Sequence, residues 1–346
     1  MPVDVVIATP LEPELVDRIR GDVPEAVLHH EPGLLPPMRY ACDHRGDPGF
    51  RRDPADEERW WELLGRGEVF FGIPGDTPDG LALAVRRCPR LRWVQGTAAG
   101  EGEKVRGAGL TSEELSRVTV TSAAGVHATT LTEFVLLGML AFAKDLPRLR
   151  RDQRARRWDH YPMRELRGAT VLILGLGGVG AETARLAKAL GMYVLGVKRA
   201  PEDVPNVDEV YGPAALPELA PRADVFVCTL PGTHETAGLV SGEIIDALPN
   251  GCIVVNVGRG ANFDEPALIE ALTAGRLAGA ALDVFATEPL PPDSPLWGLD
   301  NVLLSPHTGA LSVHENEHIV ELFVDNLRRY VRGQPLRNLV DTGSFY

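Results

Sequence analysis

Apolar residues recur along the chain in short runs that alternate with segments of helical spacing, a pattern typical of a parallel α/β protein. In the first third we predict strands at 3–8, 68–71, 91–95 and 118–121 and helices at 11–20, 57–64, 80–87 and 101–108. Residues 30–55 are rich in Pro and Gly and have no periodicity, which indicates a long surface loop or, alternatively, a segment that closes over a binding cleft.

A second alternation follows a long apolar helix at 127–146, which an Arg-rich helix continues to about Trp158. Its predicted strands are 170–174, 193–197, 225–229, 253–257, 278–284 and 302–304, with helices at 179–190, 241–247 and 265–274. An amphipathic helix at 313–331 ends the pattern. A chain of 346 residues is long enough for two domain cores.

These elements predict two Rossmann-like, doubly wound α/β domains around a cleft. The first is discontinuous: residues 1–122 and 311–346 would form a flavodoxin-like substrate domain. Residues 123–310 would form the dinucleotide-binding domain.

Composition narrows the classes of partner. There are 48 acidic and 35 basic residues, a net charge of −13, which argues against nucleic-acid binding because that rests on clustered basic side chains. The four cysteines lack metal-binding spacing, so we predict no metal site and buried, reduced thiols. Without an apolar span or a signal-like start, we expect no membrane association and a cytoplasmic location.

A glycine-rich turn at 175–180 (Gly-Leu-Gly-Gly-Val-Gly) lies between a predicted strand and a predicted helix. This G-x-G-x-x-G arrangement lets the backbone turn tightly and approach a pyrophosphate, while the helix N-terminus presents free amides to it. We therefore predict dinucleotide contacts from the following residues: Gly175, Gly177, Gly178, Val179 and Gly180.

The end of the next strand distinguishes the two nicotinamide cofactors. NAD-binding domains usually have an acidic residue there that accepts a hydrogen bond from the ribose 2′-hydroxyl. This chain has Lys198 and Arg199, with no carboxylate before Glu202. Cations at this position favour a 2′-phosphate, so we predict a preference for NADP(H), with NAD(H) possible. The alternative is that both are ordinary surface charges.

Three further polar features stand at predicted strand ends in the second half. They are Asn-Val-Gly-Arg-Gly at 256–260, Asp-Val-Phe-Ala-Thr-Glu-Pro at 283–289 and Ser-Pro-His-Thr-Gly at 305–309. The carboxyl ends of parallel strands share one edge of the sheet, so Arg259, Glu288 and His307 are expected near one crevice. With the glycine loop, these motifs make the chain resemble the D-isomer-specific 2-hydroxyacid dehydrogenase family, most densely over 122–309.

The resemblance implies a role for each matching residue. Arg259 would bind the substrate, His307 would be the acid/base and Glu288 its carboxylate partner. Asp283 would hold the nicotinamide carboxamide, with a buried structural carboxylate as the alternative. Further cofactor contacts would come from Leu230, Pro231, Thr236, Val257, Gly258 and Gly309.

The resemblance also assigns the loop after the strand at 91–95 to the substrate carboxylate, through backbone amides of Ala98, Ala99 and Gly100. Here the loop continues as Glu101-Gly102 and departs from the family's Gly-hydrophobic-Asp pattern, which weakens that assignment. A homodimer is implied as well, with the helix at 127–146 in its interface.

Together these features predict an oxidoreductase that transfers a hydride between NADP(H) and a small 2-keto or D-2-hydroxy acid. A relative acting on formate, phosphite or a phosphorylated three-carbon acid is one alternative, although formate chemistry would place Gln where Glu288 stands. Another is a non-catalytic, dinucleotide-sensing protein like the corepressors built on this fold.

Overall fold

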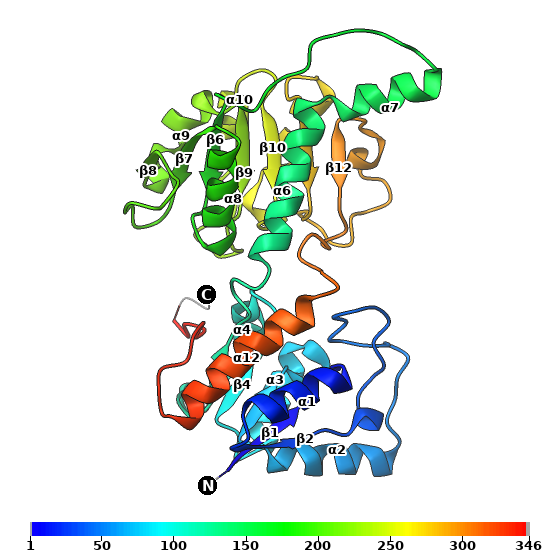
Figure 1. The fold of residues 1–346 in the computed structure, drawn as a ribbon, viewed down its shortest axis with the longest axis vertical. Coiled ribbons are helices and arrows are strands. Elements are labelled where there is room, and N and C mark those ends of the chain that lie inside the picture. Colours follow the sequence, from blue (N-terminus) through cyan, green and yellow to red (C-terminus); the bar gives the residue numbers. More distant parts are fainter. Residues whose placement is uncertain (1, 344–346) are drawn as a thin grey trace. The chain divides into compact units, whose positions relative to one another are not determined.

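The computed structural model describes residues 2–343, which divide into two compact units. The first unit runs to His127 and resumes at Leu311, and the second is Ala128–Ala310 (Figure 1). The sequence-based boundary lay at 122/123, whereas the structure continues the first unit through the turn that precedes helix α6 (Ala128–Ala143).

The first unit is built on a parallel five-stranded sheet in the order β2-β1-β3-β4-β5. This order is that of flavodoxin-like doubly wound sheets. The strands are β1 (Val3–Ile7), β2 (Ala26–His29), β3 (Val69–Phe71), β4 (Trp93–Gln95) and β5 (Thr119–Thr121). The helices are α1 (Pro13–Asp22), α2 (Pro54–Arg66), α3 (Pro78–Arg87), α4 (Glu101–Gly107), α5 (Ser112–Arg117) and α12 (Glu315–Val331).

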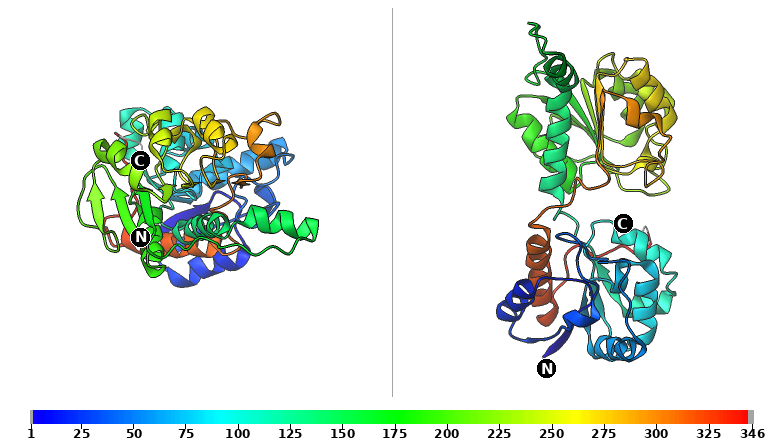
Figure 2. Two further views of the ribbon diagram at one scale, coloured as in Figure 1. Left: turned by 90° about the horizontal axis from the view of Figure 1, so that it is seen from above. Right: turned by 90° about the vertical axis from the view of Figure 1, so that its right-hand side faces the viewer.

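Alternating residues of β1 explain how both faces of this sheet are covered. Val5 and Ile7 pack in a core with Phe323 of α12, whereas Val6 and Ala8 pack with Trp60 of α2 on the opposite face. Successive side chains of a strand point to opposite faces, so a strand with apolar side chains on both faces requires helices on both sides. Figure 2 shows helices on both faces of the sheet in each unit.

The second unit contains a parallel seven-stranded sheet in the order β12-β11-β10-β9-β6-β7-β8. Its strands are β6 (Thr170–Leu174), β7 (Tyr193–Val197), β8 (Glu209–Tyr211), β9 (Val225–Cys228), β10 (Ile253–Asn256), β11 (Gly279–Leu282) and β12 (Val302–Leu304). The order reverses between β6 and β9, as in the dinucleotide-binding doubly wound fold. The predicted fold class is therefore confirmed.

Helices α6 and α8 (Gly178–Ala189) contact each other over one face of this sheet. The short helix α9 (Leu216–Leu219), α10 (Gly242–Ala247) and α11 (Glu265–Thr273) cover the other. The apolar stretch predicted as a helix at 127–146 ends at Ala143, because Asp145 adopts a left-handed conformation (φ 53°). Its side chain then accepts a hydrogen bond from Arg148 N and begins α7 (Leu146–Ala155).

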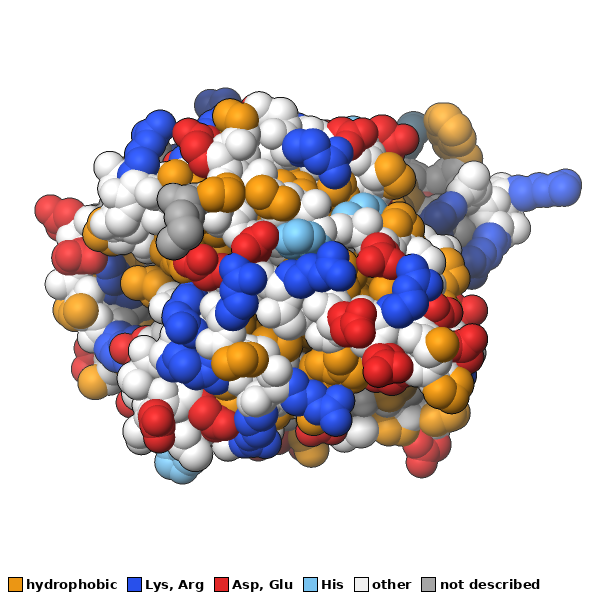
Figure 3. Space-filling model, turned by 90° about the horizontal axis from the view of Figure 1, so that it is seen from below, with side chains coloured by type: hydrophobic (Ala, Val, Ile, Leu, Met, Phe, Trp, Pro, Cys, Tyr) orange, Lys and Arg blue, Asp and Glu red, His pale blue; other side chains and the backbone are white. Residues whose placement is uncertain are grey.

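Four helices and strands had no sequence prediction: β2, β8, α5 and α9. β2 and β8 are edge strands, and most of their side chains are half-buried or exposed, so the apolar signal of a buried strand is weak there. Figure 3 shows a face on which acidic and basic side chains are interspersed. No helix within residues 2–343 is long and apolar enough to span a membrane.

Candidate active site

The glycine-rich turn lies where the order of the second sheet reverses, between the ends of β6 and β9. Gly175 has φ +98°, a conformation that L side chains rarely adopt. A Cβ at Gly180 would lie 1.9 Å from the Gly175 carbonyl oxygen, so helix and turn can pack this closely only with glycine. Thr229 Oγ1 donates to the same carbonyl oxygen at 2.9 Å and holds the turn against the end of β9.

Helix α8 begins directly at this turn. The first backbone hydrogen bond of the helix is donated by Ala181 N to Gly177 O at 2.8 Å. The preceding amides of Gly178, Val179 and Gly180 therefore have no acceptor within the helix. Free amides at a helix N-terminus, together with the helix dipole, attract phosphate groups. The residues present therefore fit a dinucleotide pyrophosphate.

The two cations after β7 each face a carboxylate. Lys198 Nζ lies 2.5 Å from Glu202 Oε1, and Arg199 Nη1 lies 3.6 Å from Glu235 Oε2. The hydrogen bond from Lys198 lowers the pKa of Glu202. Sequence reasoning noted Glu202 only as a later carboxylate and missed both pairs. Lys198 is 23% exposed and the other three side chains are 72–73% exposed, so each pair contributes little to stability. An anionic ligand can therefore replace Glu202 or Glu235 as the partner of these cations.

The residues predicted to contact the cofactor after β9 and after β10 lie close together in the second unit. A Cβ at Gly258 would lie 2.5 Å from the Leu230 carbonyl oxygen, so the ends of the two strands touch. Thr236 Oγ1 donates to Pro231 O at 2.6 Å and closes the loop between them. Val257 is buried beside this contact.

His307 and Glu288 form a direct pair. His307 Nδ1 lies 2.7 Å from Glu288 Oε2, and Glu288 Oε1 accepts from Phe285 N at 3.0 Å. The pair orients the imidazole and leaves Nε2 without a partner among residues 2–343. His307 also has a left-handed backbone (φ 56°), which is uncommon outside glycine and fits a functionally constrained position.

Asp283 fixes the turn that carries His307. It is 1% exposed, and its Oδ1 accepts from Ser305 Oγ at 2.6 Å, Thr308 N at 3.0 Å and Gly309 N at 2.8 Å. A Cβ at Gly309 would approach Asp283 Oδ2 to 2.9 Å, so glycine is needed for this contact. Asp283 therefore holds the turn 305–309, and with it the backbone of His307, in place.

Arg259 lies beside the segment that carries Glu288. A Cβ at its neighbour Gly260 would lie 1.9 Å from the carbonyl carbon of Phe285, so the two segments are in contact. Arg259 N donates to Asn262 Oδ1 at 2.9 Å, and Asn256 Nδ2 donates to Arg259 O at 3.1 Å. Arg259, Glu288 and His307 are therefore carried by adjoining loops of one unit.

In the first unit, the loop 97–100 follows β4. Ala98 N donates to Glu101 Oε1 at 2.8 Å, and Ala98 O accepts from Ala123 N at 2.9 Å. The amides of Ala99 and Gly100 have no acceptor in the described part of the chain. Of the three amides predicted to bind substrate, Ala98 is thus already engaged by a side chain that the sequence did not identify as functional.

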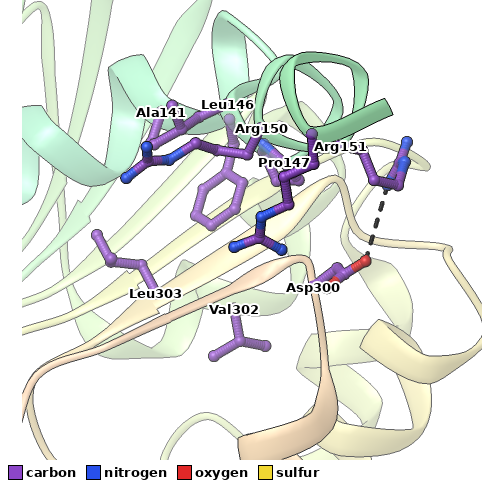
Figure 4. Close-up of a pocket in the computed structure, with 10 residues that line it drawn as sticks. Ala141, Leu146, Pro147, Arg150, Arg151, Asp300, Val302 and Leu303 are labelled. Carbon is purple, nitrogen blue, oxygen red and sulfur yellow. Dashed lines mark ion pairs between the residues drawn. The ribbon is translucent and has the colours of Figure 1, made fainter. Parts of the chain in front are cut away.

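A pocket of about 210 Å³ lies elsewhere in the second unit, between α6, α7 and β12 (Figure 4). Its apolar lining includes Phe142, Val302 and Leu303, and Arg151 pairs with Asp300 at 3.9 Å across it. None of the predicted site residues lines this pocket, so it is separate from the glycine-rich turn and from His307.

Taken together, the sheet order, the glycine-rich turn and the adjoining polar loops define a dinucleotide-binding α/β protein. Residues 136–309 match the model of the D-isomer specific 2-hydroxyacid dehydrogenase, NAD binding domain. The chain belongs to the D-isomer-specific 2-hydroxyacid dehydrogenase family.

Similar proteins include a D-3-phosphoglycerate dehydrogenase of Archaeoglobus fulgidus, 35% identical over 66% of this chain and 44% of its own length. The matched part of the chain spans only about half the length of its curated relatives, 44% and 53% in two of them. Among solved structures, a family member from Xanthobacter autotrophicus in complex with NADPH and MES is 30% identical, with a TM-score of 0.78 over 100% and 99% of the two chains.

An NADPH-dependent glyoxylate/hydroxypyruvate reductase from Sinorhizobium meliloti, in complex with NADP and sulfate, is 26% identical. Its TM-score is 0.77, over 99% of this chain and 100% of that one.

Proposed function

We propose that this protein reduces a small 2-keto acid to the D-2-hydroxy acid with NADPH, and that His307 is the proton-transfer group. The observation that carries the proposal is the 2.7 Å pair of His307 Nδ1 and Glu288 Oε2 beside the Arg259 loop, in a unit that also has the glycine-rich turn 175–180. An assay of NADPH and NADH against a panel of 2-keto acids tests it.

The chemistry of the proposed site follows from the residue types. When bound, the nicotinamide supplies the hydride. The guanidinium of Arg259 can form two parallel hydrogen bonds to the carboxylate and carbonyl oxygens of the substrate, which fixes the orientation of C2. His307 in its protonated form donates a proton from Nε2 to the carbonyl oxygen, where negative charge develops. Glu288 holds Nδ1 of the ring through the 2.7 Å contact, which leaves Nε2 to face the substrate.

For the cofactor, we propose contacts from the glycine-rich turn and from Leu230, Pro231, Thr236, Val257, Gly258, Asp283 and Gly309. Lys198 and Arg199 would bind the 2′-phosphate after releasing Glu202 and Glu235. Two similar structures are described as complexes with NADPH or NADP, which supports this preference. We propose that NAD(H) can also bind, because without a 2′-phosphate Lys198 and Arg199 can keep their pairs with Glu202 and Glu235.

Replacing Lys198 and Arg199 by Ala is expected to lower the ratio of kcat/KM for NADPH over NADH. Each lost charge-assisted hydrogen bond costs about 1.5–3 kcal/mol, and partial exposure reduces this, so a fall of roughly 10- to 100-fold is expected. Steady-state rates with both cofactors measure it. Arg185→Ala, an exposed cation on α8, should leave the ratio unchanged. An unaltered ratio in the Lys198→Ala/Arg199→Ala variant would overturn the NADP preference.

Within the family, names of relatives point to glyoxylate and hydroxypyruvate as substrates to test first. We propose that the first unit binds the substrate carboxylate through the amides of Ala99 and Gly100 and that the second binds the cofactor. The alternative, a dinucleotide-sensing protein without turnover, keeps the same residues. Measured turnover on any 2-keto acid decides between the two.

We also propose a homodimer that uses α6 and α7. Leu137 and Leu140 on α6 are 49% and 41% exposed, and Trp158 beyond α7 is 91% exposed. Leu137 and Leu140 are three residues apart and therefore share one face of α6, and exposed apolar side chains that lie together typically mark an interface. Light scattering after gel filtration is expected to give the mass of two chains, and Leu137→Glu/Leu140→Glu to give one. The matched control is Leu83→Glu on α3, where the leucine is 46% exposed. A monomeric wild type would contradict the dimer.

A further inference from the structure

The most unusual feature of the first unit is a buried carboxylate at the start of helix α4. Glu101 is 0% exposed, and its Oε2 has no partner among the described residues. Its Oε1 accepts from Ala98 N at 2.8 Å and from Lys104 Nζ at 3.2 Å. A buried carboxylate is costly unless it is paired, so its retention at this point of the chain requires an explanation.

The surroundings of Glu101 are built to accommodate it. A Cβ at Gly96 would lie 2.3 Å from Glu101 Cγ, so only glycine at the end of β4 leaves room for the side chain. Lys104 is 16% exposed and also contacts Asp76, which in turn lies 3.7 Å from Arg45 Nε. Burial raises the pKa of Glu101, and the Lys104 charge and the Ala98 amide oppose that shift.

Lysine is a rare choice in this chain, which has only four among its 35 basic residues. A compact ammonium can lie between two carboxylates, whereas the planar guanidinium of Arg needs a wider site. Asp76 reaches the ammonium from a left-handed backbone conformation (φ 52°), which costs energy outside glycine. Residue type and backbone strain thus both point to a specific arrangement around Lys104.

We infer that Glu101 is a positioning residue that sets the loop 97–100 for substrate binding, with Lys104 and Asp76 holding its carboxylate in place. The loop is fixed at Ala98 on both sides, by Glu101 at the amide and by Ala123 at the carbonyl. The amides of Ala99 and Gly100 are thereby left as the donors for the substrate carboxylate. This inference rests on the proposed function, and it explains why the chain has Glu101 where the resemblance expects a hydrophobic residue.

The test compares Glu101→Ala with Glu101→Gln. In Glu101→Ala the Ala98 amide loses its acceptor, and KM for the 2-keto acid is expected to rise roughly 10- to 100-fold, since small misplacements of a binding group have effects of this size. We expect kcat to change far less and the Kd of NADPH to stay the same. Glu101→Gln keeps an acceptor for Ala98 N and should restore KM almost to the wild-type value.

Two controls separate this role from general damage. Glu103→Ala changes an exposed glutamate two residues further along the same helix and should leave KM unchanged. If Glu101→Ala does not fold, Glu101→Leu/Lys104→Met replaces the buried pair by apolar side chains of similar volume, which folded proteins tolerate. That double variant should show the same rise in KM.

A second readout does not depend on turnover. Hydrogen exchange of the Ala98 amide should be slow in the wild type and in Glu101→Gln, and fast in Glu101→Ala. An active wild type with an unchanged KM in folded Glu101→Ala, or equal exchange in all variants, would overturn the inference. A wild type that binds NADPH and reduces no keto acid would refute the proposed function instead, and the exchange result would still report on Glu101.

Discussion

Replacing His307 by Ala is expected to lower kcat for 2-keto acid reduction by roughly 10²- to 10⁴-fold, the usual contribution of a positioned acid/base group. Without the imidazole, the carbonyl oxygen of the substrate must take its proton from water while its negative charge develops. Binding of NADPH should persist, because the glycine-rich turn and the cations after β7 do not contact His307 in any described hydrogen bond or ion pair.

Initial rates at saturating substrate measure this effect, and titration of nicotinamide fluorescence measures cofactor binding. His314→Ala is the matched control, since this histidine is 63% exposed and pairs only with Glu317 in the described part of the chain. A variant at His307 with wild-type turnover would remove the histidine from the reaction.

The second large effect is expected at Arg259. Two charge-assisted hydrogen bonds to the substrate, at about 1.5–3 kcal/mol each, correspond to a loss of roughly 10²- to 10⁴-fold in kcat/KM for Arg259→Ala. Both constants should change, because the guanidinium binds the carboxylate and also polarises the carbonyl group. Arg259→Lys should recover little activity, since an ammonium cannot form two parallel hydrogen bonds in one plane.

Steady-state kinetics of both variants give the comparison, with Arg332→Ala, an exposed arginine after α12, as the control. Full recovery in Arg259→Lys would mean that only the positive charge matters. Unchanged kcat/KM in Arg259→Ala would place the substrate elsewhere.

Much of the architecture could be predicted from the sequence. The strands at 170–174 and 193–197 have the predicted bounds because each is an uninterrupted apolar run between polar turns. The break between α6 and α7 could not be predicted, because it depends on the left-handed conformation of Asp145 inside an otherwise helical pattern. Edge strands β2 and β8 were missed because most of their side chains are not fully buried, so they lack the apolar signal of an inner strand.

The candidate site shows a similar division. The motifs around Gly175, Arg259, Glu288 and His307 were found because their residue types and order are distinctive. The carboxylates of Glu101, Glu202 and Glu235 were not, because their partners depend on how loops fold back after a strand. A single Glu after a Gly, such as Glu101, does not indicate burial. The sequence showed only that this position departs from the family's Gly-hydrophobic-Asp pattern.

The most direct test of the central claim is a product analysis with the purified protein, NADPH and glyoxylate, hydroxypyruvate and other small 2-keto acids. NADPH is expected to be oxidised in a one-to-one ratio with the 2-hydroxy acid formed, and chiral products are expected to have the D configuration. Tight binding of NADPH with no hydroxy acid from any keto acid would contradict it and would favour a dinucleotide-sensing role.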